Sequence, residues 1–182
     1  GETVEKYWAP LVKRLASRDK PVVCAVNGVA AGAGANVAFA CDIVIAARSA
    51  KFIQSFANIG LIPDTGGTWV LPRIAGQARA LGLALTAEPL SAEKAEQWGM
   101  IWKCVDDAAL EEEAITLSRK LAAGPTRGLA ATKHAIRASL LNTLDAELEI
   151  ERELMRELGF SADYQEGVAA FMEKRKPTFT GR

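Results

Sequence analysis

Strand-like segments occur only before Asp107, and after that residue the chain has helical spacing throughout. Apolar, β-branched runs predict strands at residues 22–26, 42–46, 51–54 and 100–105. The later spacing predicts helices at residues 108–123, 126–141, 144–158 and 163–174. Alternating strands and helices are typical of an α/β protein. We therefore predict an α/β core over residues 1–106 and a helical region over residues 107–182.

The first part also contains helices and one irregular segment. Apolar residues at helical spacing predict an amphipathic helix over Glu2–Ser17 with one buried stripe. Residues 55–68 have no clear period and are rich in Gly and Pro, which predicts a loop that shapes a site. Further helices are expected at residues 68–74, 77–86 and from Ser91 to Gly99. In the helical region, Asp163 and Glu166 have the spacing of a capping box.

Charge and hydropathy argue against several classes of protein. Lys+Arg and Asp+Glu are 22 each, and no basic face for nucleic acid is evident. No apolar run reaches the roughly 20 residues of a membrane span. The charged helix at Glu2–Ser17 does not resemble a signal peptide. We expect a cytoplasmic protein with no nucleic-acid or membrane partner.

Cysteine and histidine are too sparse for a metal site. Cys24, Cys41 and Cys104 are widely spaced in apolar segments and predict reduced core thiols rather than disulfides. His134 is the single histidine and is expected to be an ordinary surface or packing residue. We therefore expect no metal ion and no separate cofactor.

A glycine-rich turn, Gly32-Ala33-Gly34, lies between the first strand and an apolar helix that reaches about Ala40. A dinucleotide fold also begins with strand, turn and helix. Here the third small position is Val37 and no acidic residue follows at the required distance, which argues against that fold. A helix start presents unsatisfied N–H donors that can stabilise an oxyanion. Tight helix packing selects the same residues, so composition alone does not distinguish an oxyanion site from a packing contact.

Four motifs in order carry a resemblance to a known family. They are residues 20–34 (KPVVCAVNGVAAGAG), 41–46 (CDIVIA), 60–68 (GLIPDTGGT) and 90–99 (LSAEKAEQWG). Together they resemble the crotonase (enoyl-CoA hydratase/isomerase) superfamily. The resemblance implies a β-β-α spiral core, a helical trimerisation region and an acyl-CoA thioester substrate. It also implies that the N-terminal part of the spiral, with the first oxyanion donor, precedes Gly1.

The resemblance assigns the second oxyanion donor to the N–H of Ala33, flanked by Gly32 and Gly34 as substrate-binding residues. The two glutamates of hydratases correspond to Asn36 and Phe56, which we expect to contact substrate. Neither side chain can exchange a proton near neutral pH. Hydratase chemistry is therefore disfavoured on chemical grounds.

Asp64 is the one carboxylate within the site motifs. A single carboxylate can remove a proton beside a thioester and return it elsewhere, which is isomerisation. Asp after Pro63 is also common in turns, so a purely structural role is the alternative to the catalytic one. With both glutamates absent, we predict that Asp64 is catalytic and that an Asn36→Ala change mainly alters binding.

Several phrases, including residues 27–35, 43–51 and 161–167, resemble the branch of isomerases that convert epoxyphenylacetyl-CoA to its oxepin form in phenylacetate degradation. Phe56 would suit a ring-bearing acyl group, although a core Phe is equally ordinary. Phe171 and Lys174 match a family position where a neighbouring subunit contacts CoA. Lys174 is also at a helix end, where a cation suits the helix dipole.

The sequence thus predicts a homotrimeric or hexameric acyl-CoA isomerase. A hydratase-like or different crotonase-fold enzyme is one alternative, and a non-catalytic subunit that kept the scaffold is another. The acyl group and the choice between trimer and hexamer stay open.

Overall fold

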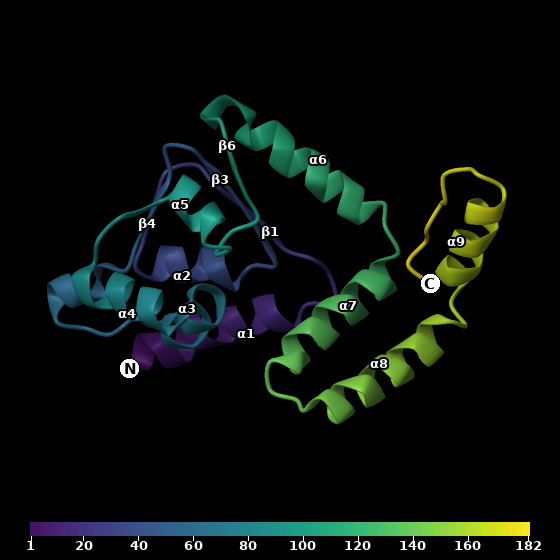
Figure 1. Ribbon diagram of the computed structural model, residues 1–182, viewed down its shortest axis with the longest axis horizontal. Coiled ribbons are helices and arrows are strands. Elements are labelled where there is room, and N and C mark those ends of the chain that lie inside the picture. The colour runs from purple at the N-terminus through teal and green to yellow at the C-terminus, as the bar shows by residue number, and fades with distance from the viewer. The chain divides into compact units, whose positions relative to one another are not determined.

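The β-branched runs of the first half pair as parallel strands. The computed structural model describes residues 1–182 (Figure 1). In one three-stranded sheet the order is β1 (Val23–Val26), β3 (Ile43–Ala47) and β6 (Lys103–Val105). Both pairings are parallel, with Val23 opposite Ile43 and Ile45 opposite Lys103. Burial of β3 agrees with its run of apolar residues, since parallel strands are covered on both faces.

A second three-stranded sheet has the order β2 (Val29–Ala31), β4 (Lys51–Ile53) and β5 (Leu90–Ser91). β2 and β4 are parallel, whereas β4 and β5 are antiparallel. We did not predict β2 or β5, because strands of three and two residues are too short to show an alternating pattern.

The chain passes twice from the first sheet to the second and then into helical structure. β1 and β2 lead into α2 (Ala33–Ala40), and β3 and β4 lead into the 3-10 helix η2 (Ser55–Ile59) and then α3 (Gly67–Ala75). η2 lies within the segment that we predicted as a loop. This order of strand, strand and helix confirms the predicted α/β class and the β-β-α arrangement.

The chain divides into two compact units. The first comprises Gly1–Ala16 and Val22–Thr116, and the second comprises Ser17–Pro21 and Leu117–Arg182. The remaining helical elements of the first unit are η1 (Val4–Trp8), α1 (Ala9–Ser17), α4 (Gln77–Thr86), α5 (Ala92–Gln97) and η3 (Asp107–Ala109). The predicted division after residue 106 concerns the spiral core and the trimerisation region, and it stays a prediction.

The predicted N-terminal helix is present, but its apolar stripe is less covered than expected. Helical structure is continuous from Glu2 to Ser17, with the π-helical turn η1 inside it. No residue of η1 or α1 is fully buried, and Val4 and Leu11 are exposed. The stripe that we predicted as buried is therefore only partly covered.

The second unit is built from helices. α6 (Leu110–Ala122) begins in the first unit, and α7 (Thr126–Ser139), α8 (Leu144–Leu158) and α9 (Ala162–Met172) follow. α7 and α8 pack side by side (Figure 1). Thr143 caps α8 by accepting a hydrogen bond from the Ala146 N–H at 3.3 Å.

The predicted capping box at α9 is wrong. Ser161 is the N-cap residue, and its hydroxyl accepts a hydrogen bond from the Tyr164 N–H at 3.1 Å. Asp163, 5% exposed, accepts from the N–H groups of Thr180 at 2.7 Å and Gly181 at 2.9 Å. Its carboxylate binds the last residues of the chain because they fold back over the start of α9.

Glu166 makes a second attachment to this C-terminal strap, residues 177–182. It accepts from the Thr178 N–H at 2.7 Å and pairs with Arg175 at 2.6 Å. The hydrogen bond from the Arg175 side chain, followed by the Thr178 bond, lowers the pKa of Glu166 to about 2. The strap is therefore held by two carboxylates one helical turn apart.

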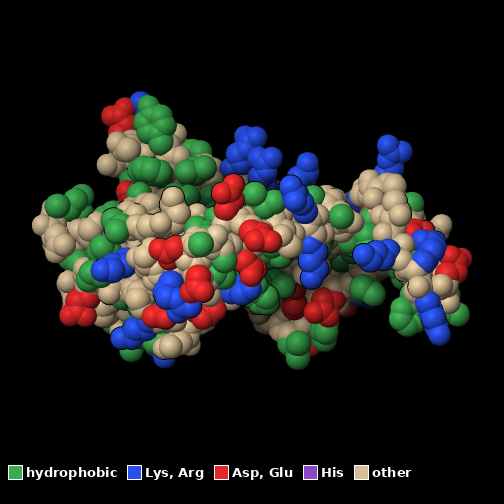
Figure 2. All heavy atoms as spheres, turned by 90° about the horizontal axis from the view of Figure 1, so that it is seen from above, with side chains coloured by type: hydrophobic (Ala, Val, Ile, Leu, Met, Phe, Trp, Pro, Cys, Tyr) green, Lys and Arg blue, Asp and Glu red, His purple; other side chains and the backbone are tan.

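The core of the first unit is apolar. Ile45 and Leu71 are among the most deeply buried large side chains, and Phe39 stacks on Phe52 with ring centroids 4.8 Å apart. The three cysteines are free and half-buried rather than deep in the core. Figure 2 shows a face on which acidic, basic and exposed hydrophobic side chains are interspersed. None of the helices combines the length and apolar content that crossing a bilayer requires.

The contact of α2 with the start of α3 depends on a glycine. A Cβ atom on Gly67 would lie 2.8 Å from Cγ of the fully buried Asn36, closer than such atoms approach. The Gly67 backbone has no positive φ, so this requirement is steric. Gly82, inside α4, has nothing within 4 Å of the same position.

We predict that Gly67→Ala lowers the free energy of unfolding by about 1–3 kcal/mol, since it overpacks the α2–α3 contact. Gly82→Ala is the matched control, and it should raise stability by about 0.5–1 kcal/mol through helix propensity. Denaturant titration of both variants measures these changes. Equal stability of the two variants would contradict the packing described here.

We also predict that attachment of the C-terminal strap depends on acidity. The folded pKa of Glu166, about 2, lies below its ordinary 4.5, so its contribution is complete above pH 4.5 and is lost as the pH falls toward 2. The protection factor of the Thr178 amide, which is the exchange rate corrected for its intrinsic dependence on pH, should fall as the pH is lowered across that range. Glu166→Gln should show a low protection factor at neutral pH and little further change on acidification. A pH response that survives in this variant would rule out Glu166 as the titrating group.

Candidate active site

The turn that begins α2 requires glycine. Gly32 has φ 53° and ψ −122°, and its N–H donates to the Ile53 carbonyl at 2.8 Å. A Cβ atom there would also lie 3.3 Å from Ser55 Oγ and 3.5 Å from Phe56 Cζ. Ser55 and Phe56 therefore pack directly against this turn.

Ala33 and Gly34 form the first turn of α2. Their N–H groups have no acceptor within the helix, and Gly32 offers no capping side chain. A Cβ atom on Gly34 would meet nothing within 4 Å, so there is open space beside it. These donors and the positive end of the helix dipole suit an oxygen atom that carries negative charge.

Asn36 connects α2 to two other segments. Its side chain is fully buried. Nδ2 donates to the main-chain carbonyl of Asp64 at 2.9 Å, and Oδ1 accepts from Nε2 of Gln54 at 2.9 Å. Both ends of the amide are thus bonded to protein, whereas the sequence predicted that Asn36 contacts substrate.

Asp64 occupies the first position of a tight turn and also presents a carboxylate. The Gly67 N–H donates to its carbonyl at 2.8 Å. The two central residues, Thr65 (φ 53°) and Gly66 (φ 77°), both have positive φ, as in a type I′ turn. The Thr65 hydroxyl donates to Asp64 Oδ1 at 2.7 Å. The turn role and the carboxylate are therefore compatible, because the turn orients the carboxylate.

Thr65 is in an unfavourable conformation for its residue type. Positive φ in a β-branched residue is a genuine outlier and costs of order 1–3 kcal/mol. Thr65 is 3% exposed, so its surroundings hold it in place. Strain of this kind beside a half-buried carboxylate is typical of functional sites.

Phe56 is buried in η2, and its ring lies against the Gly32 turn. Gly60, with φ 70°, closes η2. The first unit therefore contains Ala33, Asn36, Phe56 and Asp64, and hydrogen bonds and packing around α2 connect them. Position 56 presents a hydrocarbon ring and no ionisable group.

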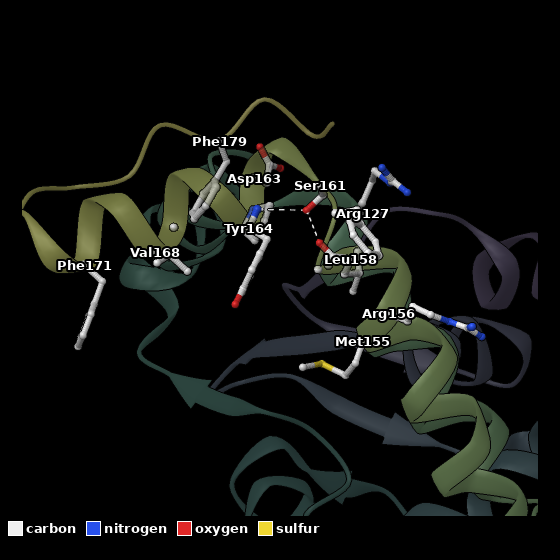
Figure 3. A pocket seen from close by; sticks show the side chains of 15 residues that line it. Arg127, Met155, Arg156, Leu158, Ser161, Asp163, Tyr164, Val168, Phe171 and Phe179 are labelled. Carbon is white, nitrogen blue, oxygen red and sulfur yellow. Dashed lines mark hydrogen bonds between the residues drawn. The ribbon is translucent and has the colours of Figure 1, made fainter.

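Phe171 lies in the second unit, on α9. It is 81% exposed and borders a cavity of about 830 Å³ between helices of that unit. Figure 3 shows Tyr164, Val168 and Phe171 on α9 and Met155 on α8 around it. The lining is mostly apolar.

Lys174 ends α9 in a left-handed conformation, with φ 53°. Its N–H donates to the Phe171 carbonyl at 3.2 Å, and the Arg175 N–H donates to the Ala170 carbonyl at 3.0 Å. These two bonds form a Schellman motif, in which glycine is the usual residue. Lys174 does not line the cavity that Phe171 borders.

Gln54, Thr65 and the steric role of Gly67 were not predicted from the sequence. A Thr before Gly66-Gly67 was a visible signal, since a β-branched residue is unusual at that place in a turn. Gln54 had no local signal. Its importance depends on a partner 18 residues away.

Other reactive side chains lie outside this site. No group of His, Cys, Asp and Glu has the arrangement of a metal site. His134 contacts Asp19 at 2.9 Å within the second unit, which agrees with an ordinary surface role. A hydrogen bond with the Cys41 side chain holds the pKa of the Cys24 thiol below its ordinary value.

Comparisons with known proteins identify relatives over the whole chain. The family described as Enoyl-CoA hydratase/isomerase matches residues 2–182. The chain is 59% identical to the 1,2-epoxyphenylacetyl-CoA isomerase of Escherichia coli K12, over all of this chain and 70% of that protein. It is 53% identical to a probable enoyl-CoA hydratase of Rhodobacter capsulatus, over all of this chain and 71% of that protein.

Solved structures indicate the same family. A crystal structure of an enoyl-CoA hydratase/isomerase from Mycobacterium abscessus superposes with a TM-score of 0.96 at 35% identity, over all of this chain and 70% of that one. The match confirms the predicted crotonase fold. On fold, motifs and relatives together, this chain belongs to the enoyl-CoA hydratase/isomerase family.

Proposed function

We propose that this protein is an acyl-CoA isomerase in which Asp64 carries the proton and the Ala33 N–H stabilises the thioester enolate. The observation that carries the proposal is the arrangement at the turn. Asp64 presents an oriented carboxylate, whereas position 36 holds an amide that is hydrogen-bonded at both ends and position 56 holds a buried phenyl ring. One carboxylate without a second acid or base suits proton relocation better than addition of water.

The proposed reaction on a 3-enoyl thioester has two steps. The Asp64 carboxylate removes a proton from C2, and the electron pair moves onto the thioester oxygen to give a dienolate. The N–H of Ala33 donates to that oxygen. Asp64 then returns the proton to C4, so the double bond moves from C3=C4 to C2=C3. The chemistry uses a carboxylate and backbone donors, and CoA enters as part of the substrate, so no added cofactor or metal is required.

The substrate class rests on the relatives and on Phe56. The Escherichia coli relative is named for 1,2-epoxyphenylacetyl-CoA, and a Streptococcus mutans relative, 40% identical, is named a trans-2-decenoyl-[acyl-carrier-protein] isomerase. A buried phenyl ring beside the Gly32 turn would suit a ring-bearing acyl group. We propose conversion of 1,2-epoxyphenylacetyl-CoA to oxepin-CoA, together with transfer of 3-enoyl to 2-enoyl unsaturation.

A hydratase is the alternative, supported by relatives named as hydratases. Hydration needs groups that position water and take up its proton. The side chains of Asn36 and Phe56 cannot accept that proton near neutral pH. Product analysis with crotonyl-CoA, a 3-enoyl-CoA and epoxyphenylacetyl-CoA decides between the two reactions.

Assembly into a homotrimer or a dimer of trimers is part of the proposal. Large apolar side chains are exposed on the C-terminal helices, among them Leu148, Met155, Phe160, Phe171 and Met172. Exposed apolar surface of this kind marks an interaction site. In this arrangement residues 1–106 supply the spiral core, and residues 107–182 supply the trimer contacts. Phe171 and Lys174 would then contact CoA bound to a neighbouring subunit.

We predict that Asp64→Asn lowers kcat for a 3-enoyl-CoA by about 10²–10⁴-fold, the usual contribution of a general base. Asn is nearly the same size and keeps the carbonyl that Asn36 and Gly67 bind, so melting temperature and acyl-CoA affinity should change little. Asp145→Asn, at an exposed position of α8, is the control and should keep full activity. If Asp64→Asn keeps more than about a third of wild-type turnover, Asp64 is only a turn residue.

We also predict that the Thr65 hydroxyl orients the carboxylate during turnover. Thr65→Val keeps the β-branched shape and the strained backbone but removes the donor, and it should lower kcat by about tenfold, as loss of orientation does. Thr65→Ser keeps the donor and should retain most activity. The pair is compared by kcat and KM on one substrate. Equal kcat values for the Val and Ser variants would show that the hydroxyl is not involved.

A further inference from the structure

We propose that Gln54 and Asn36 form an amide relay that positions Asp64 for catalysis. Gln54 Nε2 donates to Asn36 Oδ1, and Asn36 Nδ2 donates to the Asp64 carbonyl, each at 2.9 Å. Gln54 would act through Asn36, and Asn36 through the Asp64 main chain, so both would be positioning residues. The proposal rests on Asp64 being the proton carrier.

The orientation of both amides follows from a single acceptor. The Asp64 carbonyl can only accept, so Asn36 must face it with its nitrogen. Asn36 Oδ1 then faces Gln54, which must present its own nitrogen. Reversal of either amide would place two acceptors or two donors together. The relay therefore has one direction, set by the carbonyl that it holds.

In this arrangement one side-chain atom has no hydrogen-bond partner. Gln54 Oε1 is the single buried side-chain nitrogen or oxygen that has no hydrogen-bond partner, and Gln54 is 3% exposed. A buried acceptor left unpaired lowers stability. Gln54 thus supplies a donor to Asn36 while an oxygen of its own stays unpaired. Such departures from the most stable arrangement concentrate at functional sites. Methionine, which has nearly the shape of glutamine, would remove both the unpaired oxygen and the donor.

The relay also explains why position 36 carries an amide. A carboxylate there would be an acceptor facing the Asp64 carbonyl and could not donate to it. The absence of a Cβ atom on Gly67 provides the space in which the amide fits. An amide at position 36 and a carboxylate at position 64 therefore form a matched pair.

The test uses the intact natural protein and a trans-3-enoyl-CoA substrate. In Gln54→Met we expect kcat to fall about tenfold with KM nearly unchanged, because the carboxylate loses its precise position. The melting temperature should change little, since the variant removes the unpaired Gln54 oxygen while Asn36 Oδ1 loses its donor. Gln77→Met, at an exposed position at the start of α4, is the matched control and should change neither value. A residue needed only for folding would give the opposite result, a lower melting temperature with unchanged kcat.

Two further measurements separate the relay from the proton-carrier role. The sequence alone predicted that Asn36→Ala mainly alters binding, whereas the relay predicts that it lowers kcat at least as much as Gln54→Met. The double variant should be no slower than Asn36→Ala alone, because both changes act through one hydrogen bond. The Gly67 amide donates to the Asp64 carbonyl, so its hydrogen exchange measures how stably the turn is formed, independently of activity. This exchange should speed up in both variants.

The outcomes are distinct. Full kcat in Gln54→Met, together with an inactive Asp64→Asn, overturns the relay and leaves the proposed function in place. Faster Gly67 exchange in Gln54→Met, together with an active Asp64→Asn, would mean that the relay stabilises the turn but does not serve catalysis. That result would overturn the proposed function. Additive kcat losses in the double variant mean that Gln54 acts by another route, which also overturns the relay.

Discussion

One hydrogen bond, from Asn36 Nδ2 to the carbonyl of Asp64, connects the two halves of the candidate site. Asn36 lies one turn after Ala33 on α2, and its own N–H is bonded to the Gly32 carbonyl. The start of α2 and the turn before α3 are thereby joined through a buried side chain. Because that side chain is bonded at both ends and packed against Gly67, neither segment can shift alone without breaking a buried contact.

The site carries two features that do not favour stability. Thr65 holds a positive φ, and Gln54 buries an unpaired oxygen. Each is connected to Asp64, the first through the carboxylate and the second through Asn36 and the main chain. In natural proteins most residues suit the local structure in which they lie, and the exceptions concentrate at functional sites. Two such exceptions meet at one residue, Asp64, and they favour a catalytic role for Asp64 over a purely structural role in the turn.

Sequence patterns predicted the fold where the signal is local and long enough. The buried strands around Cys24 and Val44, helix α2 and the four long C-terminal helices followed from periodicity and glycine positions. β2 and β5 were missed because their pairing is set by β4, a partner distant in the chain, and not by their own few residues. The cap of α9 was misplaced because Asp163 has the right spacing for a capping box, but tertiary folding gives its carboxylate other donors.

The candidate site was likewise predictable only where its signal lies in the local sequence. Asp64 was evident as an isolated carboxylate among glycines, and Ala33 followed from a family resemblance. The direction of the Asn36 amide could not be predicted, because it depends on which atoms the fold places at either end of the side chain. Hydrogen-bond roles of this kind are tertiary properties, and residue type alone leaves them undetermined.

The C-terminal strap has a consequence for the design of shortened versions of this protein. Asp163 is almost completely buried, and its two closest donors are the N–H groups of Thr180 and Gly181. A version that stops before Thr180 would remove both donors, and Asp163 would lose the hydrogen bonds that attach the strap to the start of α9. Residues 180–182, although they form no helix or strand, therefore belong to the folded unit and should be kept in any shortened version.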